Sequence, residues 1–214
     1  MFEDRNHAGM QLSSRLEEYR SRNDVFVVGI PRGGVVVADA ISHELKLPLT
    51  IISVKKLAAP GNPELAIGAV CANGERFIDW GLALRIGVEQ QYLDQEISQK
   101  LDQAKEREKL YEIESLEEIS KNRNIVILVD DGVATGATVL GAKMCISNKK
   151  LKTVLVVPVI AKDVFKRFKK EFDQIVSLEV VDNFGAVGQY YREFSQVSDE
   201  EVINILKEHK HKNI

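Results

Sequence analysis

The sequence has few residues that could cross-link the chain and no run that could anchor it in a membrane. Only two of its 214 residues are cysteine, Cys71 and Cys145, which argues against a disulfide framework. We expect both to be buried and to pack as small hydrophobic residues. No apolar run approaches the roughly 20 residues that cross a bilayer, and the opening residues MFEDRNHAGM contain no apolar signal core. These absences predict a cytoplasmic protein that makes no use of a membrane.

Positive charge is not in excess either. The chain has 29 lysines and arginines against 32 aspartates and glutamates, for a formal net charge of -3. General nucleic-acid binding usually needs a basic surface, so this balance argues against a nucleic-acid partner. Hydrophobic residues make up 44% of the chain, which is enough for a sizeable core without staples.

Short apolar runs alternate with segments of helical spacing along most of the chain. This alternation is typical of an α/β fold, with a central, mainly parallel sheet flanked by helices. Helices are also expected near both ends, over residues 8–20 and 199–209, the second with Ser198 as its N-cap. The expected strands cover residues 25–30, 49–54, 125–129, 153–160 and 175–181.

Residues 55–112 interrupt the alternation. Residues 55–64, KKLAAPGNPE, are too rich in proline and glycine for a helix or a central strand, so we expect a mobile loop. Asn73 and Gly74 form a two-residue turn signal between two short strands. A long charged helix is expected over residues 88–111. Residues 65–112 are therefore interpreted as a hairpin and a helical arm.

The segment with the clearest chemistry is residues 127–138, ILVDDGVATGAT. A buried strand delivers Asp130 and Asp131 to the carboxyl edge of the sheet, where open α/β sheets bind ligands. Small residues and hydroxyls follow, and then a helix begins, expected to run to about Ser147. The free N–H groups of a helix start suit a phosphate. An acidic pair would repel that phosphate and must face hydroxyls or a cation, so the segment suits a ribose 5-phosphate.

An apolar run, an acidic pair and Thr-Gly-x-Thr together resemble the signature of the type I phosphoribosyltransferases, which bind phosphoribosyl pyrophosphate (PRPP). A Walker A motif and a GxGxxG after a strand are both absent from the sequence. The resemblance implies that Asp130 and Asp131 are catalytic and hold the ribose hydroxyls. The PRPP-binding residues it implies are Asp130, Asp131, Gly132, Val133, Ala134, Thr135, Gly136, Ala137 and Thr138.

Two more segments resemble this family. GIPRGG, residues 29–34, follows the first strand at the position where the family binds pyrophosphate, often with a non-proline cis peptide. There Pro31, Arg32 and Gly33 would hold pyrophosphate, with Arg32 catalytic and Lys55 adding positive charge. Residues 182–194, DNFGAVGQYYREF, resemble the hood of the hypoxanthine-guanine branch. In that role Phe184 would stack on a base, and Val187 would contact it.

The resemblance implies one phosphoribosyltransferase domain over residues 1–214, with its core at about 25–194. The small hood would combine residues 182–194 with the N-terminal helix. The implied reaction moves the phosphoribosyl group from PRPP to a nucleobase or similar nitrogen acceptor and releases pyrophosphate. It implies Mg²⁺, held through PRPP and water near Asp130 and Asp131 rather than by direct protein ligands. Many family members are dimers, so a homodimer is expected.

The sequence does not identify the molecule that accepts the phosphoribosyl group. The loop over residues 55–64 lacks the Ser-Tyr pair of purine members, and the four histidines lie outside the predicted site. One alternative is a non-catalytic regulator that senses PRPP or a nucleotide on the same fold. Such a regulator would bind nucleic acid through a basic face. The sequence offers one as Lys162, Lys166, Arg167, Lys169 and Lys170. Another alternative is hydrolysis or lyase chemistry on a phosphoribosyl compound.

Overall fold

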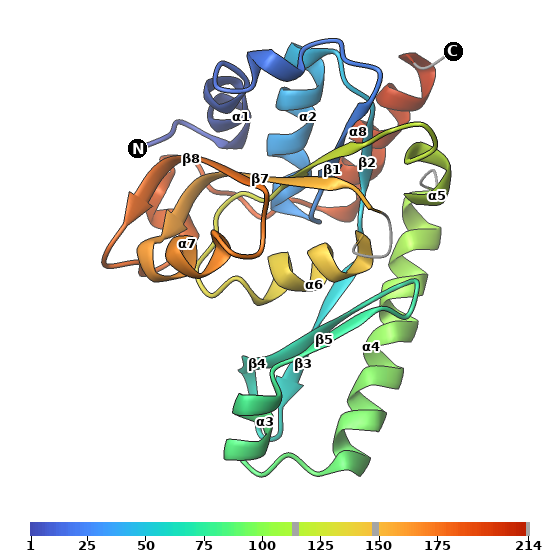
Figure 1. Cartoon of the computed structure of the whole chain (residues 1–214), viewed down its shortest axis with the longest axis vertical. Helices are drawn as coiled ribbons and strands as arrows, with labels where there is room; N and C mark the ends of the chain where they lie inside the picture. Colours follow the sequence, from blue (N-terminus) through green and yellow to red (C-terminus); the bar gives the residue numbers. More distant parts are fainter. Residues whose placement is uncertain (113–115, 147–149, 213–214) are drawn as a thin grey trace. The chain divides into compact units, whose positions relative to one another are not determined.

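The computed structural model describes residues 1–112, 116–146 and 150–212, and the chain divides into two compact units (Figure 1). Unit 1 contains residues 1–51, 111–135 and 150–214, and unit 2 contains residues 52–110 and 136–149. No helix among the described residues is long and apolar enough to cross a membrane.

A five-stranded parallel sheet forms the centre of unit 1. Its strand order is β2-β1-β6-β7-β8. Continuous valine and isoleucine runs are typical of parallel strands that are covered on both faces, and all residues of β1 and β6 are buried. The strands are β1 (Val25–Gly29), β2 (Leu49–Ile51), β6 (Ile125–Val129), β7 (Lys152–Ala161) and β8 (Gln174–Val181).

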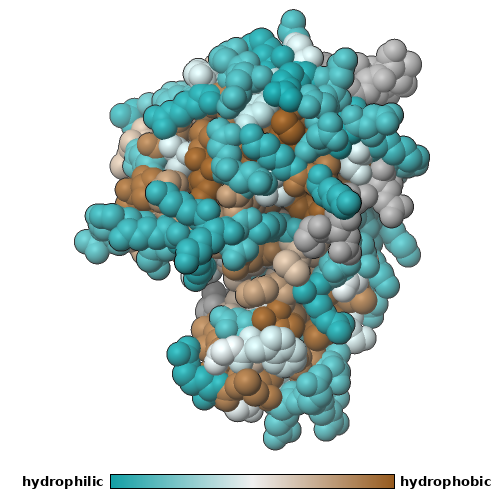
Figure 2. All heavy atoms as spheres, viewed as in Figure 1, coloured by the Kyte–Doolittle hydropathy of each residue, from teal (hydrophilic) through white to brown (hydrophobic). Residues whose placement is uncertain are grey.

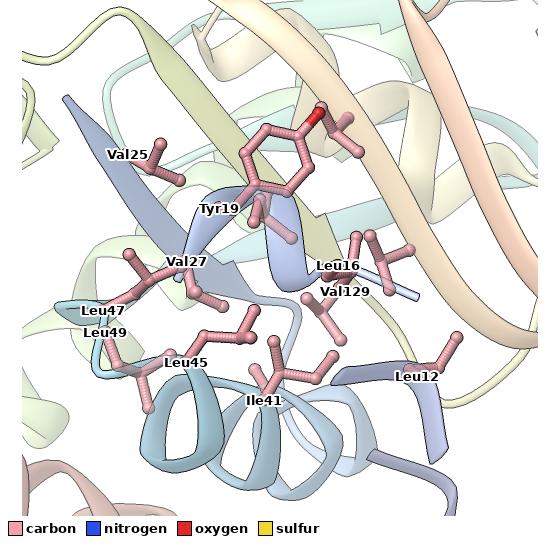
Figure 3. Packing of buried hydrophobic residues seen from close by; sticks show 14 of the residues in the cluster. Leu12, Leu16, Tyr19, Val25, Val27, Ile41, Leu45, Leu47, Leu49 and Val129 are labelled. Carbon is pink, nitrogen blue, oxygen red and sulfur yellow. The ribbon is translucent and has the colours of Figure 1, made fainter. Parts of the chain in front are cut away.

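Two N-terminal helices, α1 (Arg5–Ser13) and α2 (Gly33–Leu45), cover one face of this sheet. Figure 3 shows Leu12, Leu16 and Ile41 of α2 in one cluster with Val25 and Val27 of β1. These buried leucine, valine and isoleucine side chains, removed from water, are the main hydrophobic stabilisation of unit 1. Its other helical elements are η1 (Glu17–Tyr19), α5 (Leu116–Ile119), α7 (Lys162–Phe168), η2 (Val187–Tyr190) and α8 (Asp199–Lys212).

Unit 2 is built on an antiparallel sheet of order β3-β4-β5. Leu93 of a long helix, α4, is buried against Leu57 and Ile67 of the sheet. Around the short helix α3, Figure 2 shows hydrophobic residues at the surface, and Trp80 and Leu84 are exposed. The elements are β3 (Val54–Ala59), β4 (Asn62–Cys71), β5 (Arg76–Ile78), α3 (Trp80–Arg85), α4 (Gln90–Tyr111) and α6 (Ala137–Ile146).

The α/β fold with a parallel sheet is confirmed, and two local predictions are wrong. Residues 55–64 are the tip of the β3–β4 hairpin rather than an irregular loop, with a turn only at Pro60 and Gly61. Cys71 and Cys145 form a disulfide, because α6 packs on β4 and brings their Cα atoms to 6.0 Å. The predicted N-terminal helix ends at Ser13. Ser147, the expected end of α6, lies outside the described residues.

Candidate active site at the ends of two parallel strands

The two loops that carry the predicted site start side by side. β1 and β6 are adjacent parallel strands, with Gly29 opposite Val129 at their carboxyl ends. The N–H of Ile30 donates to the carbonyl of Val129 at 2.9 Å, which extends the pairing by one residue. The loop with Pro31 and Arg32 therefore leaves the sheet next to the loop with Asp130 and Asp131, at the edge where such sheets bind ligands.

Gly33 lets these two loops touch. A β-carbon at this position would lie 1.9 Å from Oδ2 of Asp131, so no other residue fits without moving the loop or the carboxylate. Gly34 lies in the same way against the backbone of Asp130. The Pro31–Arg32 peptide is cis, at the place that the family resemblance indicated. The acidic pair and the GIPRGG segment thus form one continuous surface in unit 1.

Asp131 is held by an arginine from the start of the chain. Nε of Arg5 lies 2.8 Å from Oδ2 of Asp131, and the Arg5 side chain is almost fully buried. The same guanidinium donates to the carbonyl of Ser195 at 2.9 Å and lies 3.8 Å from the ring centroid of Phe194. Burial raises the pKa of the Asp131 carboxyl, and the hydrogen bond and charge of Arg5 oppose that rise.

Tyr191 closes the same region from the C-terminal side. Its hydroxyl donates to the backbone carbonyl of Asp131 at 2.6 Å. Burial raises the pKa of the Tyr191 phenol, and the negative charge of Asp131 adds to this effect, so the phenol stays protonated. The N–H of Phe2 donates to the carbonyl of Tyr190, and the N–H of Arg192 donates to that of Phe2. The N-terminal segment and residues 182–194 therefore pack together over the acidic pair.

Of the two predicted base-binding residues, Val187 reaches the acidic segment. A β-carbon on Gly132 would lie 2.6 Å from Cγ1 of Val187, so these residues are in contact through the space that glycine leaves. Phe184 is half-buried, and its ring centroid lies 5.3 Å from that of Tyr190. Val187 therefore lies next to the acidic segment, and Phe184 packs on Tyr190 of the same C-terminal segment.

Val133 and Thr135 of the predicted PRPP segment are held by β7 and α7. The N–H of Val133 donates to the carbonyl of Val159 at 2.9 Å, and the carbonyl of Thr135 accepts from Nη2 of Arg167 at 2.6 Å. Thr135 and Ala134 are exposed. The chain then passes through Gly136, which has φ +80, into α6.

The structure brings some of the predicted site residues together and leaves others in the second unit. Arg32 is half-buried, and within residues 1–112, 116–146 and 150–212 its guanidinium has no hydrogen bond or ion pair. Arg32, Gly33, Asp130, Asp131, Gly132 and Val187 lie together in unit 1. Lys55, Gly136, Ala137 and Thr138 belong to unit 2.

Comparison with known proteins gives a consistent result. A model of the phosphoribosyl transferase domain family matches residues 4–195. "Putative phosphoribosyl transferase Rv0571c" of Mycobacterium tuberculosis (strain ATCC 25618 / H37Rv) is 37% identical over 215 residues, covering 96% of this chain and 46% of that protein. MT0597, a protein of the same description from strain CDC 1551 / Oshkosh, matches equally. The chain therefore spans about half the length of these curated relatives.

A solved structure is similar over nearly the whole chain. TT1426 from Thermus thermophilus is 38% identical, and the match covers 97% of this chain and 98% of that one with a TM-score of 0.79. The family match, the parallel sheet and the small antiparallel sheet agree with the type I phosphoribosyltransferase fold. This chain therefore belongs to the phosphoribosyl transferase domain family.

Proposed function

We propose that the chain transfers the phosphoribosyl group of PRPP to a nitrogen of a nucleobase or similar acceptor and releases pyrophosphate. For a member of this family, one observation supports the proposal most directly. Gly33 of the expected pyrophosphate loop lies against Asp131 of the expected ribose-binding pair. A single PRPP molecule carries both groups on one ribose ring, so its two recognition loops must meet in this way.

For the donor, we assign the ribose hydroxyls to Asp130 and Asp131, which can accept from two hydroxyl donors. The 5-phosphate is assigned to residues 134–138. Ala134 and Thr135 are exposed, and the free N–H groups at a helix start suit a phosphate. The pyrophosphate is assigned to residues 31–33, where the guanidinium of Arg32 can form a bidentate contact.

The reaction would proceed by attack of an acceptor nitrogen lone pair on C1 of the ribose. The bond from C1 to the pyrophosphate oxygen breaks, its electron pair leaves with pyrophosphate, and the acceptor loses its proton to solvent. Positive charge develops on the ribose ring before the new bond is complete. A carboxylate at Asp130 stabilises this charge. Arg5 already compensates the charge of Asp131, so Asp131 would act mainly by positioning the ribose hydroxyls.

The acidic pair also fits a magnesium ion that arrives with PRPP. Mg²⁺ prefers oxygen ligands and usually keeps several waters. Oδ1 of Asp130 accepts from the N–H of Asp131, and one oxygen of Asp131 is bonded to Arg5. These carboxylates suit contact through water better than a dedicated protein cage. Bound Mg²⁺ would neutralise the charge of the leaving pyrophosphate.

The acceptor is assigned to Phe184 and Val187. A flat nitrogen heterocycle in contact with Val187 would lie next to Gly132 and the acidic pair, because Val187 contacts Gly132. Phe184 is proposed to supply the aromatic face on which it stacks. Residues 182–194 contain no histidine, so the proposal favours an acceptor whose nitrogen is nucleophilic without a histidine base.

A pyrophosphate-release assay tests the proposed function. The full chain is incubated with PRPP, Mg²⁺ and a panel of nucleobases and amines, and the Asp130→Asn/Asp131→Asn double variant is the matched control. Release that depends on one acceptor and falls by about 10²–10³ in the variant is expected. Absence of release with every acceptor, together with tight PRPP binding, would contradict the transferase. Release without any acceptor would instead support hydrolysis or lyase chemistry.

A PRPP-sensing regulator is the second candidate, favoured by the exposed basic residues of α7 and of the two positions that follow it. Figure 2 shows hydrophilic residues over this helix, and Lys166, Lys169 and Lys170 are exposed. Two other members of the group are already engaged: Lys162 pairs with Asp182, and Arg167 donates to Thr135. A gel-shift assay with nucleic acid, repeated at raised salt, tests this candidate. Binding that responds to PRPP, without any pyrophosphate release, would favour it over the transferase.

A further inference from the structure

Three side chains of types that bind metals come together beside the C-terminal half of α2, outside the site described above. Asp39 and His43 are four residues apart and therefore lie on one face of this helix. His209 of α8 completes the group, and all three residues belong to unit 1. One ligand atom from each residue lies within 4.8 Å of the other two.

Two distances within this group are hydrogen-bond distances that also lie close to the spacing of ligand atoms around one metal ion. Nε2 of His209 lies 2.7 Å from Oδ1 of Asp39, and Nε2 of His43 lies 3.2 Å from the same oxygen. In a tetrahedral Zn²⁺ site with bonds of about 2.0–2.1 Å, any two ligand atoms are about 3.3 Å apart. Small side-chain rotations would therefore bring all three atoms to one ion.

The burial of His209 indicates that this group is part of the packed structure rather than a chance cluster at the surface. His209 is 7% exposed, and its ring centroid lies 4.7 Å from that of His43. A single carboxylate that faces two imidazoles can accept from only some of their N–H groups in each protonation state. A shared cation can bind all three side chains at once. Imidazole and carboxylate together suit borderline divalent metals such as Zn²⁺. We propose that Asp39, His43 and His209 form a binding site for a divalent transition-metal ion.

A cavity next to the histidines leaves room for a fourth ligand. Arg123 also lines it, and the buried Nε of Arg123 has no hydrogen-bond partner among the residues that the structure describes. A metal-bound water or small anion in this space could accept from that N–H group. The cavity is lined by Ser42, His43, Lys46, Leu47, Pro48, Arg123 and His209.

The proposed site is distinct from the acidic pair. Gly33, which touches Asp131, begins α2, and His43 is ten residues further along the helix, or about 15 Å at 1.5 Å per residue. The ion would join α8 to α2, where Val202 and Leu206 already pack against Val35. It would therefore act structurally, by fixing the C-terminal helix to the helix that follows the GIPRGG segment. It does not depend on the proposed phosphoribosyl transfer.

Zn²⁺ titration of the full chain tests the proposal, with any affinity tag removed. Wild-type protein competes with a chromogenic chelator for Zn²⁺, and the same titration is run on His43→Ala, His209→Gln and Asp39→Asn. The matched control is His7→Ala, which removes a histidine of α1 that contacts Gln11 rather than this group. We expect one Zn²⁺ per chain and at least about tenfold weaker binding in each of the three variants.

Two further measurements keep the test decisive if a variant folds poorly. His43 is 36% exposed, so His43→Ala is the mildest change, and circular dichroism without metal checks its fold. Zn²⁺ should also raise the Tm of wild type, and this rise should be lost in His43→Ala. Equal Zn²⁺ affinity in wild type and His43→Ala, or an equal loss of affinity in His7→Ala, would overturn the proposal.

Discussion

Each of the two units has an apolar core of its own, but a cluster of buried polar contacts is described only in unit 1. In unit 1 the strand-end site depends on polar contacts, with Arg5 against Asp131 and the hydroxyl of Tyr191 on the Asp131 carbonyl. In unit 2 the hairpin sheet packs on α4 through leucine, isoleucine and valine, and a disulfide joins Cys71 to Cys145. The buried charges of unit 1 are costly unless they are compensated, whereas apolar packing carries no such requirement. The polar contacts of Asp131 are therefore the ones in unit 1 whose loss we expect to matter most.

Of the changes considered, a glycine-to-alanine substitution in each unit should give the largest difference in kcat/KM for PRPP. Gly33→Ala puts a methyl group where Oδ2 of Asp131 lies, so the loop or the carboxylate must move. We expect kcat/KM for PRPP to fall by about 10²–10³, the usual loss when one preorganised contact is removed. Gly81→Ala in α3 is the matched control, because its β-carbon meets nothing closer than 3.5 Å. Equal activity of the two variants would show that the contact between Gly33 and Asp131 is not needed.

Breaking the disulfide should affect the stability of the chain more than its chemistry. Cys71 and Cys145 are separated by 74 residues, and cross-links of this kind usually contribute about 2–4 kcal/mol. We expect reductant to lower the free energy of unfolding in urea by about that amount. The Cys71→Ala/Cys145→Ala variant, which has no disulfide to lose, should not respond to reductant. Two reactive thiols in the denatured, unreduced chain would contradict the prediction.

The sequence was sufficient to predict the parallel sheet, because its strands are continuous runs of valine and isoleucine. The hairpin over residues 55–64 could not be predicted in the same way. Pro63 lies in β4, but β5 pairs with β4 only from Gly68 to Val70. At Pro63 the strand therefore has a neighbour on one side only, and an edge position tolerates proline. The Cys71–Cys145 disulfide likewise depends on the packing of α6 against β4, which spacing in the sequence does not reveal.

The same limit applies to the candidate site. The acidic pair and the GIPRGG segment were predicted because short motifs carry them, and the structure places the two segments in contact. Arg5 was missed because it lies 126 residues from Asp131 in the sequence and belongs to no motif. The only available signal was an arginine close to the N-terminal end of an expected helix, and such an arginine is usually solvated.

Removing Arg5 tests whether charge compensation matters in unit 1. Arg5→Ala deletes the cation that opposes the burial of Asp131, so the pKa of Asp131 should rise further. If ionised Asp131 is required, the acidic limb of the kcat/KM profile should move to higher pH. Loss of a hydrogen bond to a charged group, about 1.5–3 kcal/mol, corresponds to a roughly ten- to hundredfold decrease at the acidic end.

The control for this prediction is Arg5→Lys, which keeps the positive charge but loses the planar fork of arginine. Its acidic limb should lie between those of wild type and Arg5→Ala. A uniform loss of activity at every pH, with no movement of the limb, would mean that Arg5 supports the fold of the N-terminal segment rather than the ionisation of Asp131.

The smallest expected effect separates binding of the acceptor from binding of PRPP. Phe184→Leu removes an aromatic face but keeps apolar volume, and stacking between rings contributes about 0.5–1.5 kcal/mol beyond burial. We expect the KM for the acceptor to rise roughly two- to tenfold while the KM for PRPP stays unchanged. Phe77→Leu in β5 is the control, since Phe77 is a half-buried phenylalanine of unit 2. If both variants raise the KM for the acceptor equally, Phe184 has no special role, and the assignment of the acceptor to unit 1 is lost.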